Sequence, residues 1–190
     1  VKVLAVVANK IQPDLIDVIQ TSLKRELPDK VFVYTIPLIN QLEKPTVQEI
    51  VDELGAKVLI GKRHLNNQTG SFAVGAMQLR NFIKRIEENS LVITPGDRAD
   101  IILSSIQVNN SDNYPKISGI VLTGGLKPEK GVLKLIKGLS NVVPIISVKN
   151  GTFETANKIG SIRSHIYANN KHRIYNSLST FDKYVQIDDF

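Results

Sequence analysis

Six short runs rich in valine, isoleucine and leucine constrain the fold of this chain more than any other feature. They are residues 2–8, 31–36, 57–60, 90–94, 117–123 and 143–148. The runs are nearly continuous in apolar residues, which is typical of strands that are buried on both faces of a parallel sheet. Segments with a helical spacing of apolar residues lie between them. This alternation predicts an α/β fold with layered, mostly parallel sheets and helices on both faces.

The spacing predicts helices within residues 12–27, 45–55, 71–89, 97–107, 128–139, 152–160 and 169–190. The second has a capping-box pattern, with Thr46 placed before Glu49, and Gly55 is placed to end it. The third is predicted as one helix because its apolar side chains fall on broadly one side: Val74, Met77, Phe82 and Ile86. The last of these ranges, residues 169–190, is predicted to form a helix near the end of the chain.

A polar stretch at residues 61–71, GKRHLNNQTGS, divides the sequence into two expected units. Residues 1–61 hold three of the predicted strands. Three strands make a thin sheet, so we expect this part to be the carboxyl-terminal part of a larger α/β domain. Residues 62–71 are then a linker, and residues 72–190 a second compact domain that includes the terminal helix. The chain also begins inside a predicted strand and without Met, which favours a segment of a longer protein.

Composition argues against several classes of function. The 190 residues include no cysteine, which excludes disulfides and thiolate metal sites and favours a reducing cytoplasm. The net charge of +6 is spread along the chain, and its densest cluster, residues 61–65, has no aromatic residue beside it. We therefore expect no nucleic-acid binding. No apolar run approaches the roughly 20 residues that cross a bilayer, so no membrane partner is expected.

Two loops at the ends of predicted strands carry the candidate binding residues. Asp97 and Arg98 follow the strand at 90–94, and Thr123, Gly124 and Gly125 lie at the end of the strand at 117–123. In open α/β sheets, ligands bind at the carboxyl ends of the strands. Backbone amides in a glycine-rich turn and an arginine can hold a phosphate or carboxylate there. The five residues are our candidate site for a small anionic effector.

The same residues also have purely structural interpretations. Asp97 suits the N-cap of the helix that follows, where its carboxylate would accept backbone N–H groups. Arg98 suits an ion pair with Asp100 or a bridge to another loop at the same sheet edge. Gly124 and Gly125 suit a tight turn between a strand and a helix.

The sequence lacks an arrangement of residues typical of catalysis. His64, His165 and His172 are scattered, with no pair at i,i+4 spacing and no carboxylate cluster at a strand end beside them. The glycine-rich stretch TGGLKPEKG matches neither the dinucleotide-binding pattern nor the phosphate loop of nucleotide hydrolases. We therefore predict no catalytic residue, no metal site and no cofactor in this chain.

Two longer stretches resemble known domains. LVITPGDRADIILSSI and ISGIVLTGGLKPEKGVLKLI resemble the DRTGG domain, whose Asp-Arg and Thr-Gly-Gly signature is split here between residues 97–98 and 123–125. VLAVVANK and VFVYTIPLINQLEKPTVQEIVDELGAKVLIG resemble the last part of a P-loop domain like that of dethiobiotin synthetase. This order of domains is similar to the amino-terminal arrangement of the long form of phosphate acetyltransferase. The resemblance covers about residues 3–185.

The resemblance implies a role for the chain. Phosphate acetyltransferases move an acetyl group between coenzyme A and phosphate, and their transferase domain follows the DRTGG domain. The chain is then a non-catalytic segment for regulation and oligomer assembly, which forms a homo-oligomer and binds a small anionic metabolite. The alternative is a freestanding ligand-sensing module, because a short relative has these two domains without a transferase. The coding sequence beyond Phe190 distinguishes the two.

Overall fold

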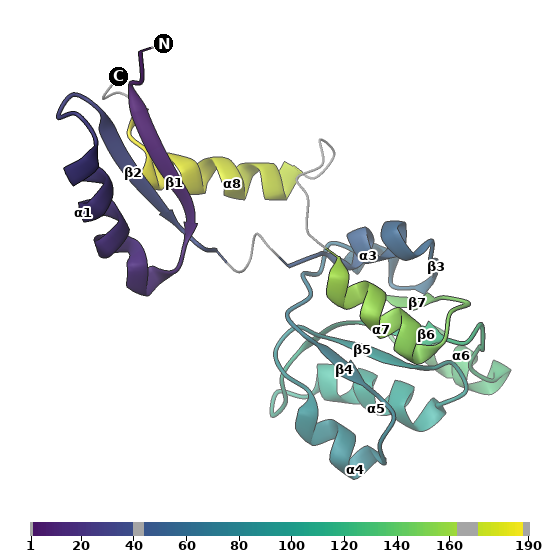
Figure 1. Cartoon of the computed structure of the whole chain (residues 1–190). Coiled ribbons are helices and arrows are strands. Elements are labelled where there is room, and N and C mark those ends of the chain that lie inside the picture. The colour runs from purple at the N-terminus through teal and green to yellow at the C-terminus, as the bar shows by residue number, and fades with distance from the viewer. Residues whose placement is uncertain (1, 40–43, 163–170, 188–190) are drawn as a thin grey trace. The chain divides into compact units, whose positions relative to one another are not determined.

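The computed structural model describes residues 2–39, 44–162 and 171–187 and divides the chain into two units (Figure 1). The first unit is formed by residues 1–43 together with 165–190, and the second by residues 44–164. Each unit has its own sheet. The expected α/β class with mostly parallel sheets is confirmed in both.

The second unit contains a five-stranded sheet in the order β3-β7-β6-β5-β4. Its strands are β3 (Lys57–Ile60), β4 (Phe72–Val74), β5 (Ser90–Pro95), β6 (Ile117–Thr123) and β7 (Ile145–Ser147). Strands β4 to β7 are parallel to one another, and β3 runs antiparallel to β7. All seven residues of β6 are buried, as its continuous apolar sequence predicts for a central parallel strand.

Helices cover both faces of this sheet. They are α3 (Val47–Leu54), α4 (Leu79–Phe82), α5 (Ala99–Asn110), α6 (Lys130–Lys137) and α7 (Thr152–Ser161). Val92, Ile120 and Leu122 point to one face and form a core with side chains from α4, α5 and α6. The alternate positions Leu91 and Val121 point to the other face, toward α3 and α7. Figure 1 shows α4 and α5 on one side of the sheet and α3 and α7 on the other.

The capping box predicted for α3 is confirmed. The Thr46 hydroxyl accepts a hydrogen bond from the Glu49 N–H, and the Thr46 N–H donates to the Glu49 carboxylate at 2.7 Å. Gly55 ends the helix in the left-handed region, with φ of +58°. Both features follow from the residue types that the sequence places there.

The first unit is a two-stranded parallel sheet. Strands β1 (Ala5–Ile11) and β2 (Phe32–Pro37) are joined by a 3-10 turn (Pro13–Leu15) and helix α1 (Ile16–Glu26). The terminal helix α8 (Lys171–Tyr184) contacts β2, and the Tyr34 hydroxyl donates to the carbonyl of Gln186 at 3.2 Å. Strand β1 begins three residues later than the run at 2–8 predicts.

The division between the units differs from the expected one. Residues 44–61, expected in the first unit, belong to the second, because β3 pairs with β7 and α3 packs on the same sheet. The terminal helix, expected in the second unit, belongs to the first. The segment expected as a linker at residues 62–71 is packed structure: Val47 N–H donates to the Asn67 carbonyl, and Thr69 N–H donates to the Pro45 carbonyl.

The single helix predicted for residues 71–89 is wrong. The segment contains the strand β4, the short helix α4 and a 3-10 turn (Ile83–Arg85). Val74 and Met77 are partly exposed, whereas Phe82 and Ile86 are buried, so the four residues do not share one face. Gly75 lies between the strand and the helix, and a Cβ there would lie 2.7 Å from the Ile101 side chain. The close approach of strand end and helix α5 requires this glycine.

Candidate functional site

The chain leaves two neighbouring strands of the second unit toward opposite faces of the sheet. After β6 it turns to α6, which packs with α4 and α5. After β7 it turns to α7, which packs on the other face with α3. The loops at the carboxyl ends of β6 and β7 therefore diverge. Such a point, where adjacent loops separate, is where open α/β sheets form their ligand crevice.

The Thr123–Gly125 loop lies at this point and is held tightly. Gly124 and Gly125 have φ angles of +75° and +67°, which L-residues with side chains rarely adopt. Their N–H groups donate to the carbonyls of Asn150 at 2.7 Å and Val148 at 2.9 Å. These two amides thus join the β6 and β7 loops. The expected tight turn is confirmed.

Thr123 links the same loop to helix α7. Its side chain is buried, and its hydroxyl lies 2.8 Å from the Thr152 hydroxyl at the start of α7. Thr152 is partly exposed. This contact fixes the first turn of α7 against the end of β6.

Asp97 and Arg98 begin α5 in a different way from the expected one. The N-cap residue is Arg98, and no side chain caps the helix. The predicted capping role of Asp97 is therefore wrong: its backbone carbonyl accepts from the Ala99 N–H at 3.0 Å. Residues 95–98 form a turn that is closed by a hydrogen bond from the Arg98 N–H to the Pro95 carbonyl. Because of this turn, the helix begins one residue later than it would if Asp97 were the N-cap.

Arg98 makes both of the structural contacts that its sequence position suggests. Its guanidinium pairs with both Asp100 oxygens at 2.8 and 2.7 Å. It also donates to the carbonyls of Gly75 at 3.3 Å and Met77 at 3.2 Å. The bridged loop is therefore the one after β4. Four donated hydrogen bonds leave Arg98 committed to holding these loops together.

The two signature loops touch at Gly96. Its N–H donates to the Thr123 carbonyl at 3.4 Å. A Cβ on Gly96 would lie 2.1 Å from the carbonyl oxygen of Leu126, just beyond Gly125. The Asp97–Arg98 loop and the Thr123–Gly125 loop are therefore direct neighbours at the carboxyl edge of the sheet, as their places after strands suggest.

The loop after β7 contributes residues that the sequence reading missed. Gly151 is the N-cap of α7 and is exposed, and no side chain caps this helix. Lys149 is exposed and lies beside Gly125, whose added Cβ would come within 3.9 Å of the Lys149 Cα. The sequence held a signal for these residues, because residues 149–152 also follow a predicted buried strand. N–H groups of a first helical turn and a lysine favour an anion.

Residues 49–162 match the model of the DRTGG domain. This match covers more than half of the chain and lies inside the second unit. The chain belongs to the DRTGG domain family. The two parts of the family's signature, Asp97–Arg98 and Thr123–Gly125, are the two loops that meet at Gly96.

Several relatives of this DRTGG chain are named phosphate acetyltransferase. One from Nitratidesulfovibrio vulgaris is 40% identical over 80% of the chain, and one from Synechocystis is 35% identical over 97%. A third, from Pseudomonas putida, is 31% identical over 90% of the chain. The chain spans only 22%, 27% and 26% of the lengths of these three relatives.

One solved structure is similar to 73% of the chain, with 22% identity and a TM-score of 0.48. It contains the CBS and DRTGG domains of the regulatory region of a Clostridium perfringens pyrophosphatase, in complex with the activator diadenosine tetraphosphate.

From the sequence we expect no catalytic histidine, metal site or membrane partner in the DRTGG chain. No group of three or more histidine or acidic residues within residues 2–39, 44–162 and 171–187 could hold a metal ion. His64 accepts a hydrogen bond from its neighbour Arg63 at 3.0 Å. His165 and the side chain of His172 lie outside the described residues. None of the helices in the same ranges is both long and apolar enough to cross a membrane.

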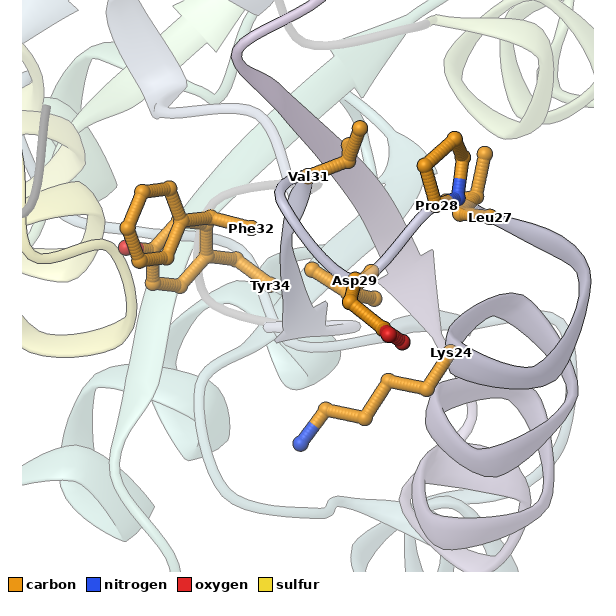
Figure 2. Close-up of a pocket in the computed structure, with 8 residues that line it drawn as sticks. Lys24, Leu27, Pro28, Asp29, Val31, Phe32 and Tyr34 are labelled. Atoms are coloured by element: carbon orange, nitrogen blue, oxygen red, sulfur yellow. The ribbon is translucent and has the colours of Figure 1, made fainter.

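A pocket of about 320 Å³ lies in the first unit, between the end of α1 and the start of β2 (Figure 2). It is lined by Lys24, Leu27, Pro28, Asp29, Val31, Phe32, Val33 and Tyr34. The rings of Phe32 and Tyr34 are stacked, with centroids 6.4 Å apart. The pocket is at the amino end of a parallel strand, opposite to the edge where α/β sheets bind ligands. We therefore do not include it in the candidate site.

The ion pair of Arg98 and Asp100 predicts a pH-dependent part of the stability. The hydrogen bond from Arg98 lowers the pKa of Asp100 below its ordinary value. A carboxyl group with a lowered pKa stabilises the fold above its unfolded pKa, and this contribution is lost as pH falls through the folded pKa. Asp100→Asn should lower the free energy of unfolding at pH 7 by at most about 1 kcal/mol, because the two side chains are 30% and 48% exposed.

Urea unfolding between about pH 5 and pH 2 tests this prediction, because this range extends from above the ordinary aspartate pKa of about 3.9 to well below it. Asp100→Asn should flatten the loss of stability over that range. Asp112→Asn is the matched control, because the Asp112 side chain is fully exposed and 3.6 Å from Lys116. An acid dependence in Asp100→Asn that equals that of the unchanged chain would contradict the assignment.

Proposed function

We propose that this chain is a regulatory and oligomerisation segment of a phosphate acetyltransferase, the enzyme that converts acetyl-CoA and phosphate into acetyl phosphate and coenzyme A. The supporting observation is the pattern of matches: relatives of that name match 80–97% of the chain, while the chain spans about a quarter of them. A segment of that size fits one part of a longer enzyme, with the transferase site in another part.

The first unit fits the end of a larger P-loop-like domain. Two parallel strands rarely form a stable sheet alone, and parallel sheets are normally covered on both faces. Here Val3, Leu4 and Val18 are each more than half exposed. Further strands and helices of a complete domain would cover such side chains. In this proposal, residues 1–43 are therefore the end of a P-loop-like domain.

The effector in this proposal is a small anionic metabolite bound at the carboxyl edge of the second unit. Thr123, Gly124 and Gly125 form one wall, and the first turn of α7 forms the other. Because the Gly124 and Gly125 amides and Arg98 are engaged with other loops, the direct donors are the N–H groups that follow Gly151, together with Lys149. Asp97 and Arg98 then act by fixing the neighbouring loop.

Isothermal titration calorimetry of the chain with NADH, pyruvate, phosphoenolpyruvate and nucleotides tests the effector. For the compound that binds, Lys149→Met should weaken affinity about 10-fold, the effect of losing one charge-assisted hydrogen bond of about 1.4 kcal/mol. Lys137→Met removes a charge that is also exposed, at the far end of α6, and should leave affinity unchanged.

Two results would contradict the proposal. The first is an absence of heat with all four classes of compound together with a monomer at every concentration, since neither regulation nor assembly would then remain. The second is synthesis of acetyl phosphate by this chain alone, since the transfer reaction would then occur in it. A stop codon directly after Phe190 would favour the freestanding ligand-sensing module over the enzyme segment.

A further inference from the structure

Strand β4 forms one edge of the five-stranded sheet. Among the residues that the structure describes, its one partner in the sheet is β5. Leu91 N–H donates to the Ser71 carbonyl, and Gly75 N–H donates to the Ile93 carbonyl, both at 2.8 Å. In a parallel ladder, alternate residues bond to one neighbour, so residues 71, 73 and 75 face β5. The N–H and C=O groups of Phe72 and Val74 therefore point outward.

The outer edge of β4 is apolar and carries no charge. Residues 71–78, SFAVGAMQ, include no charged side chain. Phe72 is 45% exposed and Val74 37% exposed. Natural sheet edges that stay unpaired are usually protected by lysine, proline or a bulge. The opposite edge has such protection, because β3 and the residues after it carry exposed Lys57, Lys62 and Arg63.

Helix α7 extends the apolar strip beside this edge. Ala73 points into the core on the α5 side, so Phe72 and Val74 point to the α7 side. The Phe72 ring lies against Gly160, whose added Cβ would be 3.8 Å from it. Phe153 is 80% exposed and lies seven residues before Gly160, on the same helix face. Phe72, Val74 and Phe153 form what we call the β4 edge strip.

We propose that the β4 edge strip pairs with the same strip of a second copy of the chain, across a twofold axis that passes beside Ala73. Twofold symmetry requires the two β4 strands to run antiparallel. Phe72 of one copy then lies opposite Val74 of the other, and these are the residues whose backbone groups point outward. Each such pair exchanges two hydrogen bonds. The two sheets become one sheet of ten strands.

The geometry favours a second copy over an unrelated peptide. The outward-facing residues, Phe72 and Val74, are placed symmetrically about Ala73, so the edge is complementary to itself. Identical surfaces repel when they carry charge, and residues 71–78 carry none. This interface concerns only how two copies of the chain assemble. It names the surface that the assembly role proposed above would use, and it does not require an effector.

Disulfide trapping tests the register. The chain has no cysteine, so each single-cysteine variant reports one position. Ala73 faces its own copy in a non-hydrogen-bonded pair, with Cα atoms about 4.5 Å apart, which a disulfide can span. Residues 72 and 74 are offset from their own copies by roughly 8 Å, which a disulfide cannot span. Under mild oxidation, Ala73→Cys should form at least 10-fold more covalent dimer than Phe72→Cys or Val74→Cys.

Sedimentation velocity gives a second measurement that needs no cysteine. The unchanged chain should dimerise, and Val74→Lys should raise the dimer dissociation constant at least 10-fold by adding a charge to the edge. Leu135→Lys is the matched control, because Leu135 is 56% exposed on α6 and away from β4. It should leave the dissociation constant unchanged.

Several outcomes would overturn the interface. The first is that the unchanged chain keeps a mass of 21.0 kDa at every concentration. The second is a dimer that Val74→Lys does not weaken. The third is equal crosslinking at positions 72, 73 and 74. A dimer that survives Val74→Lys would leave the proposed assembly role standing and remove only this surface. Calorimetric silence would remove the effector and leave the interface standing.

Discussion

Gly96→Ala should lower the free energy of unfolding of the second unit by about 3 kcal/mol, the upper part of the range for overpacked substitutions. The added methyl group would lie 2.1 Å from the carbonyl oxygen and 2.5 Å from the carbonyl carbon of Leu126. Both contacts are with backbone, so no side-chain rotation relieves them. The loop after β5 must move away from the loop after β6, which also breaks the hydrogen bond from Gly96 N–H to Thr123.

Gly131→Ala is the matched control for this change. Gly131 lies in the first turn of α6, and an added Cβ would meet no atom within 4 Å. Because alanine favours a helix over glycine, this variant should be stabilised by up to about 1 kcal/mol. Urea unfolding followed by far-UV circular dichroism measures both changes. A loss of less than about 1 kcal/mol in Gly96→Ala would show that the two signature loops are not in close contact.

The same substitution also bears on the proposed effector. If the anionic metabolite binds between the Thr123–Gly125 loop and the start of α7, a displaced Thr123–Gly125 loop should weaken it. The affinity of Gly96→Ala, measured under conditions where it is folded, should then fall more than that of Gly131→Ala. Equal affinities would separate the structural role of the signature from ligand binding.

The central strands were predictable because burial on both faces leaves a direct mark on the sequence. The predicted run at 117–123 has the same bounds as β6, and that at 57–60 the same bounds as β3. Strand β4 left no such mark. It has three residues, only Ala73 of which is buried. Its last residue, Val74, and the nearby Met77 happen to fall at helical spacing.

The division into units depends on contacts between distant parts of the chain. β3 pairs with β7, almost ninety residues later, and α8 returns to β2. Hydrophobic periodicity reports which face of an element is buried and not which element covers it. The polar stretch at 61–71 therefore had the composition of a linker, although its backbone is hydrogen-bonded to residues 45–48.

The candidate site was predictable in its location and less so in its contacts. Strand ends are visible in the sequence, so the two signature loops could be placed at one edge of a sheet. The partners of Arg98 could not all be found, because the carbonyls of Gly75 and Met77 follow the strand that the sequence did not reveal. The role of Lys149 depends on its closeness to Gly125, which only the fold provides.

Gly61→Ala should lower the free energy of unfolding by about 3 kcal/mol, through two separate costs. Gly61 has φ of +76°, where a residue with a Cβ is strained by about 1 kcal/mol. In addition, the new Cβ would lie 2.7 Å from the Val143 carbonyl oxygen and 2.8 Å from two backbone atoms of Pro144. Separating those segments would pull β3 away from β7, at a further cost of about 2 kcal/mol.

Gly55→Ala isolates the second cost. Gly55 has a similar φ of +58°, but an added Cβ would meet nothing within 4 Å, so this variant should lose only about 1 kcal/mol. Urea unfolding compares the two, and hydrogen exchange at β7 locates the effect. Near-equal losses would mean that Gly61 directly precedes a linker, as expected from the sequence for residues 62–71. A loss about threefold larger in Gly61→Ala would mean that residues 57–61 are part of the folded sheet of the DRTGG domain, so that this domain needs β3 and cannot be cut after residue 61 without losing stability.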